Sequence, residues 1–175
     1  HQTPREYTDG DEGETITLRL VLKLLADTGL VGFPNAGKSS LLGRLTNAHP
    51  TVASYPFTTL NPIIGTLVFE DFARMTVADI PGLIEGAHQG VGLGDAFLRH
   101  IERATFLVYV IDMAAVDGRT PHEDFRCLRH ELGQYKAEIL DRPSLIVANK
   151  MDLPGAEENL ALFRSATGHA ALPVS

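Results

Sequence analysis

The fold of this chain is decided by one stretch, Leu30-Val31-Gly32-Phe33-Pro34-Asn35-Ala36-Gly37-Lys38-Ser39-Ser40. Within it, Gly32 to Ser39 matches the phosphate-binding pattern G-x-x-x-x-G-K-[ST]. Glycines let the main chain turn sharply and bring several N–H donors close to the oxygens of a di- or triphosphate. In this pattern the lysine, here Lys38, reaches the terminal phosphates, and the hydroxyl of Ser39 takes a position on Mg²⁺.

The sequence on either side of the loop supports this interpretation. Gly29 to Val31 is typical of a short buried strand, and Ser40 to Leu45 begins a helix, whose N-terminal amides favour an anion. A glycine turn beside an isolated lysine is the alternative, but it leaves the flanking strand and helix unexplained. The predicted phosphate-binding residues are Gly32, Asn35, Ala36, Gly37, Lys38, Ser39 and Ser40.

The composition excludes several functional classes. With 175 residues, of which 44% are hydrophobic, the default is one globular domain with a sizeable core. The formal net charge of −7 argues against a domain that holds nucleic acid by charge alone. A single cysteine, Cys127, excludes an internal disulfide and fits a reducing compartment. The longest apolar runs, 18–26 and 106–116, are short or interrupted by charges, so we expect no membrane span.

The N-terminal part of the chain differs from the rest. Residues 1–13 are polar and rich in turn formers, whereas Thr15 to Leu20 alternates like a half-exposed strand. A strand ahead of the phosphate-loop unit suggests the end of a preceding domain. We therefore predict a linker and domain remnant over 1–26 and a nucleotide-binding domain over 27–175.

The remaining strands and helices predict an α/β fold. Ile63 to Phe69 and Arg74 to Ala78 are expected to form an antiparallel hairpin. The continuous apolar runs Phe106 to Ile111 and Leu145 to Ala148 are typical of strands buried on both faces. Strands that alternate with amphipathic helices predict a mostly parallel sheet covered by helices on both faces.

Two further motifs follow predicted strands in the order that a guanine-nucleotide site requires. Asp79-x-x-Gly82 closes a strand, where the carboxylate can hold Mg²⁺ and the glycine amide can touch a γ-phosphate. After a buried strand, Asn149-Lys150-x-Asp152 places a carboxylate that can accept hydrogen bonds from the N1–H and the amine of guanine. Adenine lacks this donor pair. In this interpretation Asn149 braces the loop and the stem of Lys150 covers the base; a surface turn is the alternative for this motif.

These motifs and their surroundings resemble the G domain of the Obg family of GTPases. The resemblance runs from about Leu18 to the end of the chain, and Gly86 to Gly90 is its most family-specific part. The segments that carry it are Gly32–Ser39, Tyr55–Leu60, Asp79–Gly94, Phe97–Arg103 and Val147–Pro154.

The resemblance implies a P-loop NTPase fold, a Ras-like G domain, that hydrolyses GTP with Mg²⁺. It further implies GTP and GDP as ligands, the large ribosomal subunit or its precursor as partner, and a switch role in the assembly of that subunit. We expect a monomer in bacterial cytoplasm, or in an organelle if the source is eukaryotic. On this resemblance, residues 1–26 include the end of the family's glycine-rich domain.

The resemblance also assigns the nucleotide-contacting residues. Of two adjacent threonines, Thr59 is favoured over Thr58 as the switch threonine that closes on Mg²⁺, together with Ser39 and Asp79. The implied segments are switch I with Phe57, Thr58 and Thr59, switch II with Asp79, Ile80, Pro81, Gly82 and Leu83, and guanine contacts at Asn149, Lys150, Met151, Asp152 and Ser175.

One departure from the Ras pattern bears on catalysis. Leu83 stands where Ras-like enzymes carry a glutamine that orients the attacking water, so slow intrinsic hydrolysis is expected. Related GTPases with asparagine at the position of Asn35 bind K⁺ beside the phosphates, and we hypothesise the same here; the alternative is that Asn35 caps its own loop. His88 is a candidate for positioning water once a partner orders the glycine-rich switch, or else a solvated side chain. The candidate catalytic residues are Lys38, Thr59, Asn35 as a potassium ligand, and His88.

The second departure concerns the C-terminus. The family's last guanine-contacting motif begins at the position of Ser175, and its final helix would follow. We therefore expect this stretch alone to bind guanine weakly or to fold marginally.

Two alternative functions stay open at this point. A small-molecule or nucleoside kinase shares the phosphate loop, but it would need an arginine-bearing lid and would leave Asn149 to Asp152 unexplained. The second alternative is a nucleotide-sensing binding module with negligible turnover. Leu83 supports it, because leucine cannot orient the attacking water.

Overall fold

The computed structural model describes residues 26–46, 51–52, 63–79, 101 and 104–175, together with 10, 13 and 15–17. Its elements, in chain order, are β1 (Thr28–Val31), α1 (Lys38–Leu45), β2 (Thr51–Val52), β3 (Ile63–Val68), β4 (Arg74–Asp79), β5 (Phe106–Asp112), α3 (Pro121–Tyr135), the 3₁₀ helix η2 (Ala137–Ile139), β6 (Ser144–Asn149), α4 (Ala156–Thr167) and β7 (Leu172–Pro173).

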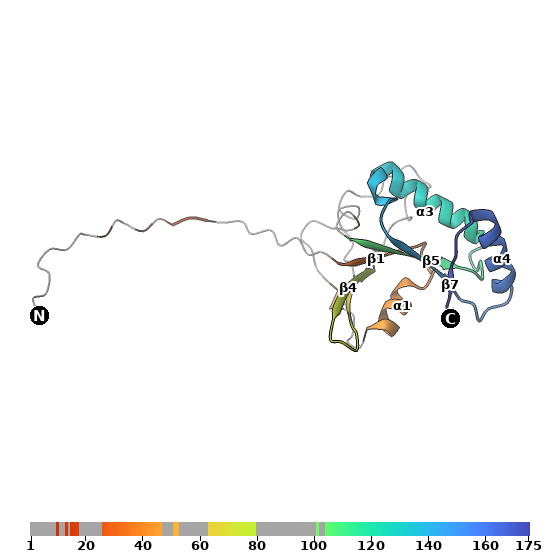
Figure 1. Cartoon of the computed structure of the whole chain (residues 1–175), viewed down its shortest axis with the longest axis horizontal. Helices are drawn as coiled ribbons and strands as arrows, with labels where there is room; N and C mark the ends of the chain where they lie inside the picture. The colour runs from red at the N-terminus through yellow and green to blue at the C-terminus, as the bar shows by residue number, and fades with distance from the viewer. Residues whose placement is uncertain are drawn as a thin grey trace, which may run out of the picture.

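The described strands form a seven-stranded sheet in the order β2-β3-β4-β1-β5-β6-β7 (Figure 1). β1 lies at the centre, parallel to β4 on one side and to β5 on the other. β6 and β7 continue the parallel part, whereas β2 and β3 run antiparallel at the other edge. The predicted α/β fold with a mostly parallel sheet is confirmed, including the β3–β4 hairpin.

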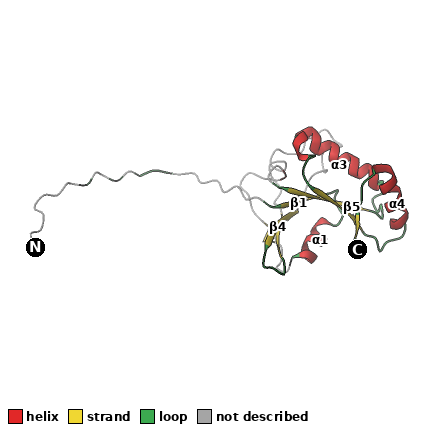
Figure 2. Cartoon of the chain, viewed as in Figure 1, coloured by secondary structure: helices red, strands yellow, loops and turns green. Residues whose placement is uncertain are grey.

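Helices cover both faces of the sheet, as predicted. Figure 2 shows α3 and α4 on one side and α1 on the other. The side chains of β1 alternate accordingly: Leu30 packs with Leu42 of α1, whereas Val31 belongs to the larger core beneath α3 and α4. Both faces of β5 are buried or half-buried, and accordingly its residues Phe106 to Ile111 form a continuous apolar run.

An aromatic cluster joins the central sheet to the two helices on its larger core face. The ring of Phe125 on α3 meets Tyr109 of β5 at 5.3 Å between ring centroids and Phe163 of α4 at 5.5 Å, both edge to face. Tyr109, Phe125 and Phe163 are all buried. Such pairs contribute about 0.5–1.5 kcal/mol each beyond the area that they bury, so this cluster fixes α3 and α4 against the sheet.

Two local features differ from the sequence prediction. Thr15 to Thr17 are exposed and form no strand, because alternation makes a strand only where a neighbour pairs with it, and none of the described residues does. Conversely, Thr51 and Val52 form the short edge strand β2 by pairing with Ile64 and Ile63, too short a segment to show periodicity. The domain boundary at residue 26 remains a prediction.

The sheet topology brings the ends of four parallel strands to one edge. Leu30 pairs in register with Asp79, Val31 with Tyr109, and Asp112 with Asn149. In open α/β sheets, ligands bind at the carboxyl ends of the strands. No helix within the described part of the chain is long and apolar enough to cross a membrane.

Candidate nucleotide-binding site

The loop from Gly32 to Gly37 connects the end of β1 to the start of α1 and is shaped by two close approaches. A Cβ on Gly32 would meet the carbonyl oxygen of Val110 on β5, and one on Gly37 would meet the side-chain nitrogen of Asn149. Gly37 also has a φ of 97°, which side chains rarely adopt. Both glycines of the phosphate-binding pattern are therefore required where they stand.

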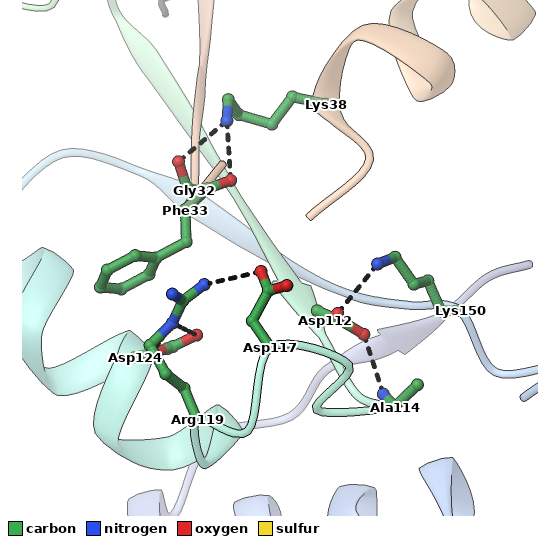
Figure 3. A network of polar contacts seen from close by, with 9 residues as sticks. All are labelled: Gly32, Phe33, Lys38, Asp112, Ala114, Asp117, Arg119, Asp124 and Lys150. Atoms are coloured by element: carbon green, nitrogen blue, oxygen red, sulfur yellow. Dashed lines mark hydrogen bonds and ion pairs between the residues drawn. The ribbon is translucent and has the colours of Figure 1, made fainter. Parts of the chain in front are cut away.

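Lys38 lies across the start of this loop. Its Nζ donates to the carbonyl oxygens of Gly32 and Phe33, each at 2.9 Å (Figure 3). An ammonium group has three N–H donors, so one remains for an oxygen of a terminal phosphate. Burial lowers the pKa of Lys38, and the charge of Asp79 opposes that shift. A phosphate would supply further negative charge to this partly desolvated cation.

Ser39 and Asp79 form the part of the site that fits a magnesium ion. The Ser39 hydroxyl donates to Oδ2 of Asp79. Asp79 is the last residue of β4 and is only 3% exposed. Among the described residues, Oδ1 of Asp79 is buried without a hydrogen-bond partner. A buried carboxylate oxygen without a partner is costly, and hydroxyl and carboxylate oxygens are the ligands that Mg²⁺ prefers. The donor set present therefore fits the cofactor implied by the sequence.

The predicted guanine motif lies next to the phosphate loop. Asn149, at the end of β6, donates from Nδ2 to the carbonyl oxygen of Ala36 at 2.7 Å. The next residue, Lys150, has a left-handed φ of 63° and pairs through Nζ with Asp112 of β5 at 2.9 Å. The side chain of Asp152 is exposed two residues further on. The structure thus joins the phosphate and base motifs, which are far apart in the sequence.

The end of the described chain also reaches the guanine motif. The amide of Val174 donates to Ala148 at 2.9 Å, and the amide of Met151 donates to Val174 at 3.1 Å. Ser175 follows directly, after the short strand β7. Met151 and Ser175 therefore lie at the same end of the sheet as Asn149.

Sequence reasoning missed a brace on the phosphate loop. The guanidinium of Arg119 lies 4.4 Å from the ring centroid of Phe33, which is 3% exposed. Arg119 is held in turn by Asp117 and Asp124, both at 3.2 Å (Figure 3). Burial raises the pKa of the Asp124 carboxyl, and Arg119 opposes this shift. No spacing pattern links Phe33 to the loop before α3, so the sequence carries no signal of this contact.

Asp112 was missed as well, although its position offers a signal. It is an acidic residue that ends a continuous apolar strand, at the carboxyl edge where ligands bind.

Several predicted site residues lie outside the described residues. They are Phe57, Thr58, Thr59, Ile80, Pro81, Gly82, Leu83 and His88. Their assigned roles remain predictions.

The sheet order and the position of each motif define the class of protein. A phosphate loop follows β1, an aspartate ends β4, and an Asn-Lys-x-Asp motif follows β6. This is the architecture of a P-loop, Ras-like G domain.

Comparison with known proteins gives the family. Residues 27–150 match the family described as "50S ribosome-binding GTPase". The chain belongs to this family, and its resemblance to the Obg GTPases is confirmed. It is 57% identical to GTPase Obg of Akkermansia muciniphila over 164 residues, covering 94% of this chain and 47% of that protein. GTPase Obg of Geobacillus kaustophilus is 53% identical over 167 residues, covering 95% and 39%. The chain thus spans less than half the length of these relatives.

Solved structures agree on the fold. A single-residue variant of Aquifex aeolicus Era bound to GDP·AlF₄⁻ aligns with a TM-score of 0.62 at 20% identity, covering 86% of this chain and 51% of that one. The G domain of Thermotoga maritima FeoB aligns with a TM-score of 0.56 at 21% identity, covering 86% of each.

Proposed function

We propose that this chain binds GTP and hydrolyses it to GDP and phosphate, as the nucleotide-dependent switch of a protein that acts in large ribosomal subunit assembly. One observation carries the proposal: the Asn149 side chain donates to Ala36, which makes the base motif and the phosphate loop one site. The family description and the Obg relatives support the same activity.

In the proposed mechanism the loop amides and Lys38 bind the phosphates, and Ser39 with Asp79 holds Mg²⁺. The ion, when bound, neutralises charge on the β- and γ-phosphates. Asp152 selects guanine because adenine would leave its carboxylate without matching donors. Thr59 and Gly82 are proposed to follow the γ-phosphate as the two switch contacts.

Slow turnover follows from Leu83, which cannot hydrogen-bond a water. We infer that K⁺ beside Asn35 stimulates hydrolysis. Asn35 is exposed with a φ of 61° in the loop before α1, so its side chain is accessible to an ion beside the phosphates. The K⁺ dependence of turnover separates this role from the alternative, in which Asn35 caps its own loop. A binding module with negligible turnover is the second candidate; the kinase alternative loses support because Asn149 already has a place beside the phosphate loop.

The cellular setting is proposed from the relatives. Those cited here are bacterial, which favours the bacterial cytoplasm over an organelle. The large ribosomal subunit or its precursor is the proposed partner, and a monomer is expected.

The test is a titration with fluorescent GDP and GTP, with ATP as competitor, in K⁺ and then Na⁺ buffer. We expect guanine-selective binding and faster GTP turnover in K⁺. Asp152→Asn should shift the preference from guanine to xanthine, whereas Asp141→Asn, the same change at another exposed aspartate, should not. ATP binding as tight as GTP binding would refute the proposal, and equal turnover in K⁺ and Na⁺ would remove the role of Asn35.

A further inference from the structure

Asp112 is the acidic residue at the end of β5, opposite Asn149 in the register of β5 and β6. Two hydrogen bonds hold the backbone of the next residue, Met113. Its amide donates to the carbonyl oxygen of Asn149 at 3.0 Å, and its carbonyl oxygen accepts from Nδ2 of Asn159 on α4 at 2.7 Å. One carboxylate oxygen accepts the amide of Ala114 at 2.9 Å. The carboxylate therefore has a defined position at the edge of the sheet that carries the nucleotide site.

The other oxygen of Asp112 holds Lys150. The pair is 2.9 Å long, and the side chains of Lys150 and Asp112 are 22% and 12% exposed (Figure 3). Such a shielded pair is screened by salt much less than a pair on the surface. It joins a residue of β5 to the loop that follows β6.

Lys150 needs an external anchor to act on a base. A lysine side chain is a flexible four-carbon stem, and immobilising such a rotamer-rich side chain on binding costs conformational entropy. The left-handed backbone of Lys150, at a φ of 63°, sets where the stem leaves the chain, and Asp112 sets where it ends. With both ends held, the stem is ordered before the nucleotide arrives.

We propose that Asp112 is a positioning residue for guanine-nucleotide binding: it holds the Lys150 ammonium so that the stem of that lysine is ready to cover the base. The inference rests on the proposed role of Lys150 beside the base. Asp112 itself is assigned no contact with the nucleotide. Its influence passes through Lys150, and this sets it apart from a residue that merely stabilises the turn at Ala114.

A double-mutant cycle on nucleotide release separates these roles. The variants are Asp112→Asn, Lys150→Met and the double variant, and the probe is a fluorescent GDP whose dissociation rate is followed after excess GDP is added. We expect Asp112→Asn to release GDP about tenfold faster, equivalent to about 1.4 kcal/mol. When position 150 is already methionine, Asp112→Asn should either leave the GDP release rate unchanged or lower it. In that background the carboxylate of Asp112 has no cation to hold, so removing its charge costs nothing.

Two controls accompany the cycle. Glu138→Gln breaks another lysine pair, 3.3 Å from Lys136, at an exposed position of the 3₁₀ helix η2, and should leave GDP release unchanged. Thermal unfolding without nucleotide should show that Asp112→Asn, which removes one partner of a shielded pair and therefore unfolds at a lower temperature, is still folded at the temperature of the release assay. If Asp112→Asn does not fold, Asp112→Glu, which keeps the charge but moves it by one methylene, replaces it in the cycle.

Each contrary outcome identifies what fails. The positioning role would be overturned if Asp112→Asn accelerated GDP release equally whether position 150 is lysine or methionine. It would also be overturned if Asp112→Asn alone left the release rate unchanged. If Lys150→Met released GDP at the original rate, the base-covering role of Lys150 and with it this inference would be wrong. Absence of GDP binding by the unchanged chain would instead overturn the proposed function.

Discussion

Replacing Gly37 by alanine tests the geometry that unites the phosphate loop and the base motif. A Cβ at this position meets Nδ2 of Asn149, the atom that donates to the carbonyl oxygen of Ala36 at 2.7 Å. The alanine must also adopt the left-handed φ of 97° that Gly37 has. The left-handed backbone costs an L-residue about 1–2 kcal/mol. Loss of the Asn149 hydrogen bond adds about 1 kcal/mol. The binding-competent loop is then disfavoured by about 2–3 kcal/mol, and GDP affinity should fall about 30- to 150-fold.

The assay is equilibrium titration with fluorescent GDP, paired with thermal unfolding without nucleotide. Gly168→Ala is the matched control, because Gly168 ends α4 at a φ of 72° but, among the described residues, no atom lies within 4 Å of its would-be Cβ. Both variants carry the backbone penalty, so both should unfold at lower temperature, whereas only Gly37→Ala should lose GDP affinity. GDP binding within threefold of the original, or an equal loss in Gly168→Ala, would refute the reasoning.

Three further predictions concern stability. Phe72→Gly should raise the free energy of unfolding by about 0.5–1 kcal/mol in urea titration, because Phe72 combines a left-handed φ of 63° with 85% exposure. Asp27→Asn should lower stability by up to about 1 kcal/mol at pH 7, with the difference shrinking as the pH falls below 3.8. The amide and hydroxyl of Thr76, each 2.7 Å from the carboxylate, hold the pKa of Asp27 below its usual value. The contribution of Asp27 to stability is therefore fully present above pH 3.8 and is lost as the pH falls below it. Arg119→Ala should lower the free energy of unfolding by about 1–2 kcal/mol and weaken GDP binding, since it uncovers the ring of Phe33.

Each of these has a contrasting result. Val116→Gly, at an exposed position, should destabilise, so equal signs for Val116→Gly and Phe72→Gly would contradict the role of the left-handed backbone. A constant difference between Asp27→Asn and the unchanged chain from pH 7 to about pH 2.5 would contradict the lowered pKa. Arg119→Lys should be little more stable than Arg119→Ala, because lysine lacks the planar group that stacks on a ring. If Arg119→Lys were as stable as the unchanged chain, the charge at this position alone would suffice.

The sequence by itself determined the class of fold and predicted which residues make up the candidate site. The phosphate loop, the aspartate that ends the hairpin and the Asn149 to Asp152 motif each lie within a few consecutive residues, so the sequence alone shows their spacing and their flanking strands. The apolar runs of β5 and β6 likewise predicted a parallel sheet, because strands buried on both faces lose the polar alternation.

Only the tertiary structure decided which distant residues meet. Sheet order and strand register place Asp112 beside Lys150 and bring Asn149 to Gly37, and the packing of the loop before α3 sets Arg119 on Phe33. None of these contacts follows from sequence spacing, because each joins separate elements whose positions depend on how the whole sheet assembles. Helical and strand periodicity record only which face of an element is buried, and not what lies against it.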